Sequence, residues 1–189
     1  MKNSSEFRDE VWEEFYKPNH YAVGLKLPWF STFQKLRFRS SEVTIWTGFN
    51  GAGKSQILGQ IFSDFISQQE RVCIASMEMK PRKLLKRMYR QVTCSEMPDQ
   101  DTFEKCNRWL SNGLWVFNVK GRAKTESIFK VFKYARMRYG VRQFLIDSLA
   151  KCGIGEDDYQ AQKTFIEDCC DISEELDSHI HIVAHSRKK

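Results

Sequence analysis

Short runs rich in β-branched and aromatic residues recur along the chain, separated by longer amphipathic stretches. These runs are apolar on both faces rather than alternately polar and apolar. That pattern is typical of strands buried on both sides of a parallel sheet. It predicts five strands, at residues 42–48, 71–78, 114–119, 141–147 and 180–186.

The stretches between these strands carry apolar side chains at helical spacing. Residues 128–135 place them at i, i+3, i+4 and i+7, with lysines and arginines facing away, and residues 84–92 and 165–176 repeat the stripe. Strands that alternate with helices imply right-handed βαβ units. We therefore expect an α/β fold with a doubly wound, mainly parallel sheet and helices on both of its faces.

The N-terminal stretch has a different pattern. Phe7, Val11 and Phe15 share one helical face, and Pro18 ends the run. A helix this apolar buries its stripe against something. It either packs onto its own domain or acts as a linker helix that docks on a neighbouring subunit. We divide the chain into this N-terminal helix, residues 1–23, and one domain, residues 24–189.

Composition narrows the class of protein. The chain has 189 residues, a net charge of +6 and 41% hydrophobic residues, which fits one folded domain. No stretch is apolar enough for a membrane span, and the start is too acidic for a signal peptide. We therefore expect a cytoplasmic or organellar protein that contacts no membrane. The six cysteines form no CxxC pair, and the adjacent Cys169 and Cys170 are unsuited to a shared zinc site with His179 and His181.

One motif predicts a nucleotide site. Residues 48–55 match GxxxxGK[ST], follow a predicted strand and precede an apolar helix. The glycines allow a tight turn whose N–H groups cradle phosphates, the lysine supplies a point charge, and the serine hydroxyl is placed to bind Mg²⁺. The nucleotide-binding residues are therefore Gly48, Phe49, Asn50, Gly51, Ala52, Gly53, Lys54 and Ser55.

Three polar residues at the ends of other predicted strands complete this site. Asp147 ends QFLID, as expected for a carboxylate that helps Ser55 to hold magnesium. Glu78 ends RVCIASME and is a candidate general base for the attacking water. His185 ends IHIVAH and is a candidate sensor of the γ-phosphate. Open α/β sheets bind ligands at the carboxyl ends of their strands, so this convergence favours an NTPase.

At these motifs the chain resembles the RecA-like ATPase domain of hexameric replicative DNA helicases, of the DnaB, Twinkle and phage primase–helicase type. The similarity lies in the lead-in and phosphate loop, in SMEMKPRKLL, in QFLIDSL and in IVAHSRK. The resemblance implies ATP and Mg²⁺ as cofactors, with Glu78 as catalytic base and His185 as γ-phosphate sensor. It also implies DNA unwinding by a hexameric ring in the full-length protein.

The resemblance also implies contacts with DNA, and the chain differs from the family at its C-terminal end. Single-stranded DNA would meet the loops after residues 147 and 185, at Lys151, Arg187, Lys188 and Lys189, although an acidic stretch at 155–158 opposes this. The family's core continues past the sensor strand to an arginine finger, so the domain looks truncated. Nothing in the given sequence resembles a primase module, and the resemblance implies a primase as a further partner, whether on the same polypeptide or a separate one.

Other functions remain open on sequence alone. A RecA- or KaiC-like ATPase of recombination or regulation shares the phosphate loop, although the segment MEMKP favours the helicase. A non-hydrolysing, ATP-binding assembly module is a further alternative, since no arginine finger is identifiable. The basic run at 80–90 falls on a predicted helix, where we expect a solvated or subunit-facing surface rather than a groove that binds a ligand.

Overall fold

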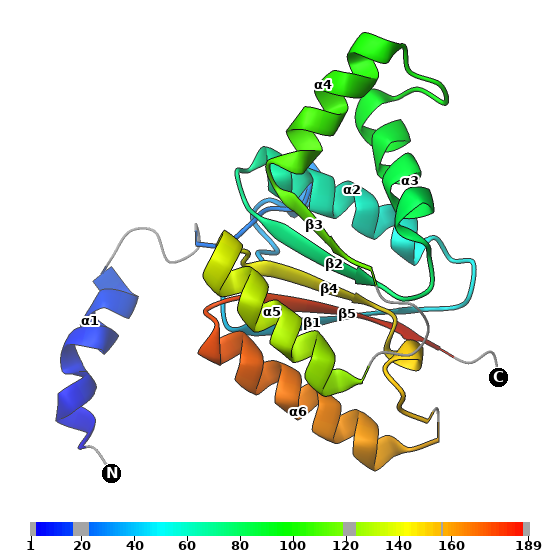
Figure 1. Ribbon diagram of the computed structural model, residues 1–189. Coiled ribbons are helices and arrows are strands. Elements are labelled where there is room, and N and C mark those ends of the chain that lie inside the picture. The colour runs from blue at the N-terminus through cyan, green and yellow to red at the C-terminus, as the bar shows by residue number, and fades with distance from the viewer. Residues whose placement is uncertain (1–2, 17–22, 119–123, 156, 187–189) are drawn as a thin grey trace.

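The computed structural model describes residues 3–16, 23–118, 124–155 and 157–186 (Figure 1). Its described strands form one sheet in which every pairing is parallel, in the order β1-β5-β4-β2-β3. This arrangement confirms the predicted parallel α/β fold. The strands are β1 (Glu42–Gly48), β2 (Val72–Ser76), β3 (Leu114–Phe117), β4 (Gln143–Asp147) and β5 (His179–His185).

Helices cover both faces of the sheet, as the alternating pattern predicts. On one face lie α2 (Lys54–Ser67), α3 (Pro81–Thr93) and α4 (Gln100–Ser111), the last two as a projecting pair (Figure 1). On the other lie α5 (Thr125–Tyr139) and α6 (Tyr159–Glu175). Helix α4, capped by Asp99, was not among the predicted elements.

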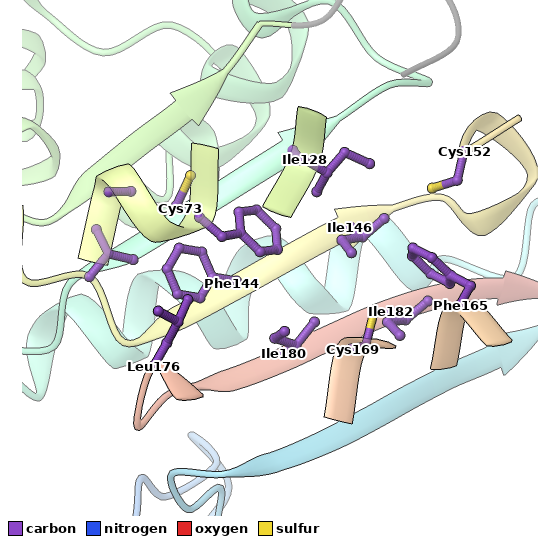
Figure 2. Close-up of a cluster of buried hydrophobic side chains, with 14 of the residues drawn as sticks. Cys73, Ile128, Phe144, Ile146, Cys152, Phe165, Cys169, Leu176, Ile180 and Ile182 are labelled. Carbon is purple, nitrogen blue, oxygen red and sulfur yellow. The ribbon is translucent and has the colours of Figure 1, made fainter. Parts of the chain in front are cut away.

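The core consists of two apolar layers separated by the sheet. Alternate residues of one strand enter opposite layers: Phe144 and Ile146 face α5 and α6, while Leu145 faces α2. Figure 2 shows the first layer, where Phe144 and Ile180 lie among side chains from both flanking helices. Strands β2 and β4 and most of β5 are buried on both faces, which explains why they lack polar alternation. The strands at the two ends of the order, β1 and β3, are only partly buried, contrary to the expectation for all five.

Several strand boundaries differ from the sequence prediction by one or two residues, and two of the strand ends matter here. Strand β2 ends at Ser76, so Glu78 lies two residues beyond the strand rather than on it. The third strand ends at Phe117, whereas its predicted end, Val119, lies outside the described residues. The departure of the chain after Ser76 matters for the site, because it lets Glu78 turn towards the neighbouring strand ends.

The N-terminal helix α1 (Arg8–Tyr16) stands apart from the sheet in Figure 1. Its apolar side chains remain exposed, with Phe15 78% and Trp12 55% accessible. By contrast, Leu27 is buried in the core, and Leu25 pairs with Phe38. The division at residue 23 and the docking of α1 on a neighbouring subunit stay predictions. None of the described helices is long and apolar enough to cross a membrane.

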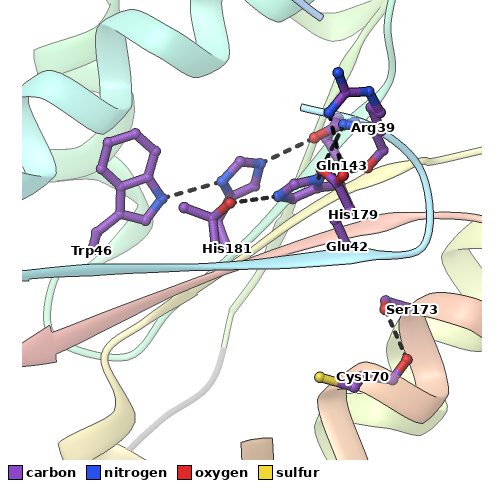
Figure 3. Close-up of polar contacts among 9 residues, drawn as sticks. Arg39, Glu42, Trp46, Gln143, Cys170, Ser173, His179 and His181 are labelled. Carbon is purple, nitrogen blue, oxygen red and sulfur yellow. Dashed lines mark hydrogen bonds and ion pairs between the residues drawn. The ribbon is translucent and has the colours of Figure 1, made fainter. Parts of the chain in front are cut away.

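A buried histidine pair bridges strands β1, β4 and β5 (Figure 3). The rings of His179 and His181 stack with centroids 4.4 Å apart. Trp46 donates its indole N–H to His181 Nδ1 at 3.1 Å, so the opposite nitrogen, Nε2, donates to Gln143 Oε1 at 3.0 Å. Both rings lie on the α2 face of the sheet, whereas Cys169 is buried on the α5–α6 face, so these residues are not brought together as a zinc site.

The hydrogen bonds of both histidines suit neutral rings. His179 Nδ1 lies 2.6 Å from the carbonyl oxygen of Arg39, which only accepts, so this nitrogen carries the proton and Nε2 accepts from Thr44. Burial lowers the pKa of His179, outweighing that hydrogen bond and the nearby charge of Glu42. Burial also lowers the pKa of His181 well below its ordinary value, and the neighbouring His179 lowers it further.

We expect the folded protein to lose stability as the pH falls below about 6.5, the ordinary pKa of histidine. Because the folded-state pKa is depressed, protons bind preferentially to the unfolded chain, and each such histidine removes up to about 1.4 kcal/mol per pH unit. Urea unfolding at pH 7.5 and 5.5 measures this loss. His181→Gln should remove close to one histidine's share of the loss, and an unchanged pH dependence would contradict the assignment.

Candidate nucleotide-binding site

The phosphate loop connects the end of β1 to the start of α2. Gly51 and Gly53 have φ values of 80° and 86°, in the left-handed region where a side chain would be strained. Gly53 immediately precedes Lys54, the first residue of α2, and the hydrogen bonds of that helix begin with those that Gln56 and Ile57 donate to the Gly53 carbonyl oxygen. The N–H groups of Lys54 and Ser55 come before these bonds, at the end of the helix that can face an anion. The loop therefore has the backbone needed to cradle an anion.

The side chain of Lys54 folds back over the loop. Its Nζ donates to the carbonyl oxygens of Gly48 at 2.5 Å and Phe49 at 3.0 Å. These contacts hold the ammonium group in the hollow that the loop borders. A phosphate bound there would meet a positioned positive charge.

Ser55 and Asp147 contact each other at the edge of the sheet, although they are far apart in the sequence. Ser55 Oγ donates to Asp147 Oδ2 at 3.0 Å, which joins the start of α2 to the end of β4. Asp147 is 3% exposed, and its other oxygen, Oδ1, is buried with no hydrogen-bond partner among the described residues. Burial raises the pKa of Asp147, and the negative charge of Glu78 raises it further against the bond from Ser55.

This geometry fits a magnesium ion. An unpaired, buried carboxylate oxygen beside a serine hydroxyl is the oxygen-rich environment that Mg²⁺ prefers, and Mg²⁺ would relieve the cost of burying that charge. The described residues contain no group of three or more His, Cys, Asp or Glu arranged around a metal. The remaining magnesium ligands would therefore be water and phosphate, as is usual for this ion.

Glu78 is held by two neighbours. Ser148 donates its hydroxyl to Glu78 Oε1, and His185 Nε2 lies 2.8 Å from the same oxygen. Burial raises the pKa of Glu78, but these two hydrogen bonds and the charges of His185 and Lys151 outweigh it, so the pKa is lowered. The carboxylate is thus ionised at neutral pH, as a proton acceptor must be.

Most of the predicted residues line a single hollow. A cavity of about 800 Å³ is lined by the loop from Asn50 to Ser55, and by Glu78 and His185. This volume suits a nucleotide, since ligand cavities span about 300–1,000 Å³. A second hollow of about 760 Å³ shares Asn50 and His185 with the first and is lined by Phe49 and Tyr159.

The candidate DNA-binding residues divide into two groups. Lys151 ends the short 3-10 helix Leu149–Lys151 and lines the same hollow as the phosphate loop. Its contact with DNA stays a prediction. Arg187, Lys188 and Lys189 lie outside the described residues.

The structure adds two residues that the sequence motifs did not identify. Ser148 directly follows Asp147 and contacts Glu78, although a serine after a strand-ending acid resembles any turn residue. Arg87 comes from α3 and lines the nucleotide hollow. Arg87 belongs to the basic run at 80–90 that we expected to be solvated. Its position along the helix places it on the side that faces the phosphate loop.

Comparisons with known proteins support the fold. No protein-family model matches the chain. A solved structure described as an ATPase domain matches with a TM-score of 0.80 at 17% identity, over 99% of this chain and 72% of that one. A DnaB-like replicative helicase, described with its interactions with primase, matches with a TM-score of 0.77 at 15% identity.

The second match covers 98% of this chain but 48% of the helicase, so the chain spans about half the length of that protein. Both matches confirm the expected fold, that of the RecA-like ATPase domain in DnaB-type helicases. At these identities the likeness establishes architecture. Activity, substrate and partners therefore rest on the site itself.

Proposed function

We propose that this chain binds ATP with magnesium and hydrolyses it, as the motor domain of a DnaB-like replicative DNA helicase. The observation that carries the proposal is the convergence of five side chains, from α2, β4, β5 and the segment after β2, at one edge of the sheet. Ser55 is bonded to Asp147, Glu78 is bonded to His185, and Lys54 lies over the phosphate loop beside them.

Each of these residues has a distinct task in the proposed reaction. Lys54 and the loop N–H groups bind the phosphates, while Ser55 and Asp147 hold magnesium, which neutralises charge on the phosphates. Glu78 orients the attacking water and accepts its proton. No rearrangement of the sheet is needed, since the five groups already lie at the same edge.

His185 links the nucleotide to the rest of the ring in this proposal. It ends β5 and contacts the base Glu78, so it is placed to respond when the γ-phosphate is lost. The chain continues from His185 into the segment that we expect to meet single-stranded DNA. The proposed assembly is a hexameric ring, with a primase as an additional partner.

The proposal is tested with the longest natural form of the protein. We expect ATPase activity that single-stranded DNA stimulates, together with ATP-dependent unwinding of a forked duplex. Strand exchange without unwinding would instead support a recombinase. Nucleotide binding with no turnover at high protein concentration would support the non-hydrolysing module.

A further inference from the structure

A third hollow adjoins the nucleotide site on the α3 side. Its volume is about 750 Å³, and it shares Gln56, Met79 and Arg87 with the hollow that the phosphate loop borders. The shared wall makes the two spaces neighbours across Arg87. The space along α3 is therefore large enough for a ligand of its own.

The charge of this hollow is strongly positive. Lys83, Lys86, Arg87 and Arg90 occupy positions i, i+3, i+4 and i+7 of α3, so they form one face of the helix, and all four line the hollow. Arg90 is paired with Glu96. Among the described residues, the other three have no carboxylate partner, so their charges are available to an anion.

The other lining groups indicate what kind of anion fits. No aromatic residue of the described chain lines this hollow, and its one acidic residue, Glu96, is the partner of Arg90. The other lining residues are Gln56, Met79, Gln91, Cys94 and Ser95. Proteins that hold single-stranded nucleic acid combine basic residues with aromatic rings on which bases stack. A basic hollow without such rings favours a phosphate chain over a nucleic-acid strand.

We propose that the hollow along α3 is a second anion site that binds the phosphate chain of a small molecule, next to the nucleotide site. Lys83 and Lys86 would hold the outer phosphates, and Arg87 the end nearest the phosphate loop. Because Arg87 lines both hollows, an occupant here would sense the state of the nucleotide site directly. The inference does not require that the chain hydrolyses ATP.

Tripolyphosphate is the probe for this site. The phosphate loop is first saturated with ADP, and tripolyphosphate is then titrated calorimetrically into the full-length chain at low and high salt. We expect one equivalent to bind, more weakly as salt rises, because exposed charges are screened. The double variant Lys83→Ala/Lys86→Ala should weaken binding roughly tenfold or more while leaving ADP affinity unchanged.

The matched control is Lys130→Ala/Arg138→Ala, which removes the same charge from the exposed surface of α5. Equal weakening in the control, or no binding beside ADP, would overturn the proposal. Displacement of tripolyphosphate by a single-stranded oligonucleotide that lacks terminal phosphates would also overturn it, in favour of a nucleic-acid site. Failure to bind ADP would instead count against the proposed function. In that case, tripolyphosphate binding that depends on Lys83 and Lys86 would still support the second anion site.

Discussion

Lys54→Ala is expected to abolish measurable ATP hydrolysis, a loss of at least about a hundredfold, and to weaken nucleotide binding. The ammonium group is the positive side chain that closes over the phosphate loop, and its bonds to Gly48 and Phe49 also brace the loop itself. Removing it takes away both the charge and the brace. Steady-state phosphate release and ADP titration measure the two effects separately.

The exposed Lys130 provides the control for this experiment. Lys130→Ala has the same change in charge and should leave both quantities unchanged. Thermal unfolding confirms that the two variants are equally folded. Hydrolysis at the wild-type rate by Lys54→Ala would remove the phosphate loop from the proposed mechanism.

Glu78→Gln should reduce turnover by about a hundredfold to ten-thousandfold, the usual contribution of a general base, while nucleotide still binds. The amide keeps the size of the side chain but does not accept a proton from water. Single-turnover kinetics with bound ATP separate this loss from any change in affinity. Near-wild-type turnover would eliminate Glu78 as the base, and Glu104→Gln on the exposed surface of α4 is the matched control.

Ser148→Ala tests whether the hydrogen bond from Ser148 lowers the pKa of Glu78. The hydroxyl of Ser148 stabilises the ionised form of Glu78, so its removal should raise the pKa of the carboxylate. Activity that depends on ionised Glu78 should then be lost at a higher pH than in the wild-type protein. The acidic limb of the kcat/KM profile therefore moves upwards, whereas a purely structural role for Ser148 would lower the profile without shifting it.

Much of the site was predictable because of one property of parallel sheets. Their strands point the same way, so residues that end different strands gather at one edge, and Gly48, Asp147 and His185 each end a strand in the structure. The type of each residue then indicates its chemistry. The positions of these three residues and of the phosphate loop follow from local sequence patterns, so they could be predicted from the sequence.

The remaining features depend on contacts between distant segments. The partners of the histidine pair, Trp46 and Gln143, follow from the order of strands in the sheet, and no local pattern records that order. The same holds for Ser148, whose contact with Glu78 requires β2 and β4 to be neighbours. Helix α4 was missed because it buries only Cys106 and Leu110, too sparse a stripe to stand out.

The order of the strands also has a consequence for how the protein forms. β1, which leads into the phosphate loop, pairs in the described sheet with β5, and their side chains meet across 135 residues of sequence. Contacts between such distant segments form slowly, because the entropy cost of closing a long loop comes before the favourable energy of the contacts. During synthesis the phosphate loop therefore lacks its neighbouring strand until β5 has left the ribosome. We therefore expect nucleotide binding by this chain to appear only after β5 has been synthesised.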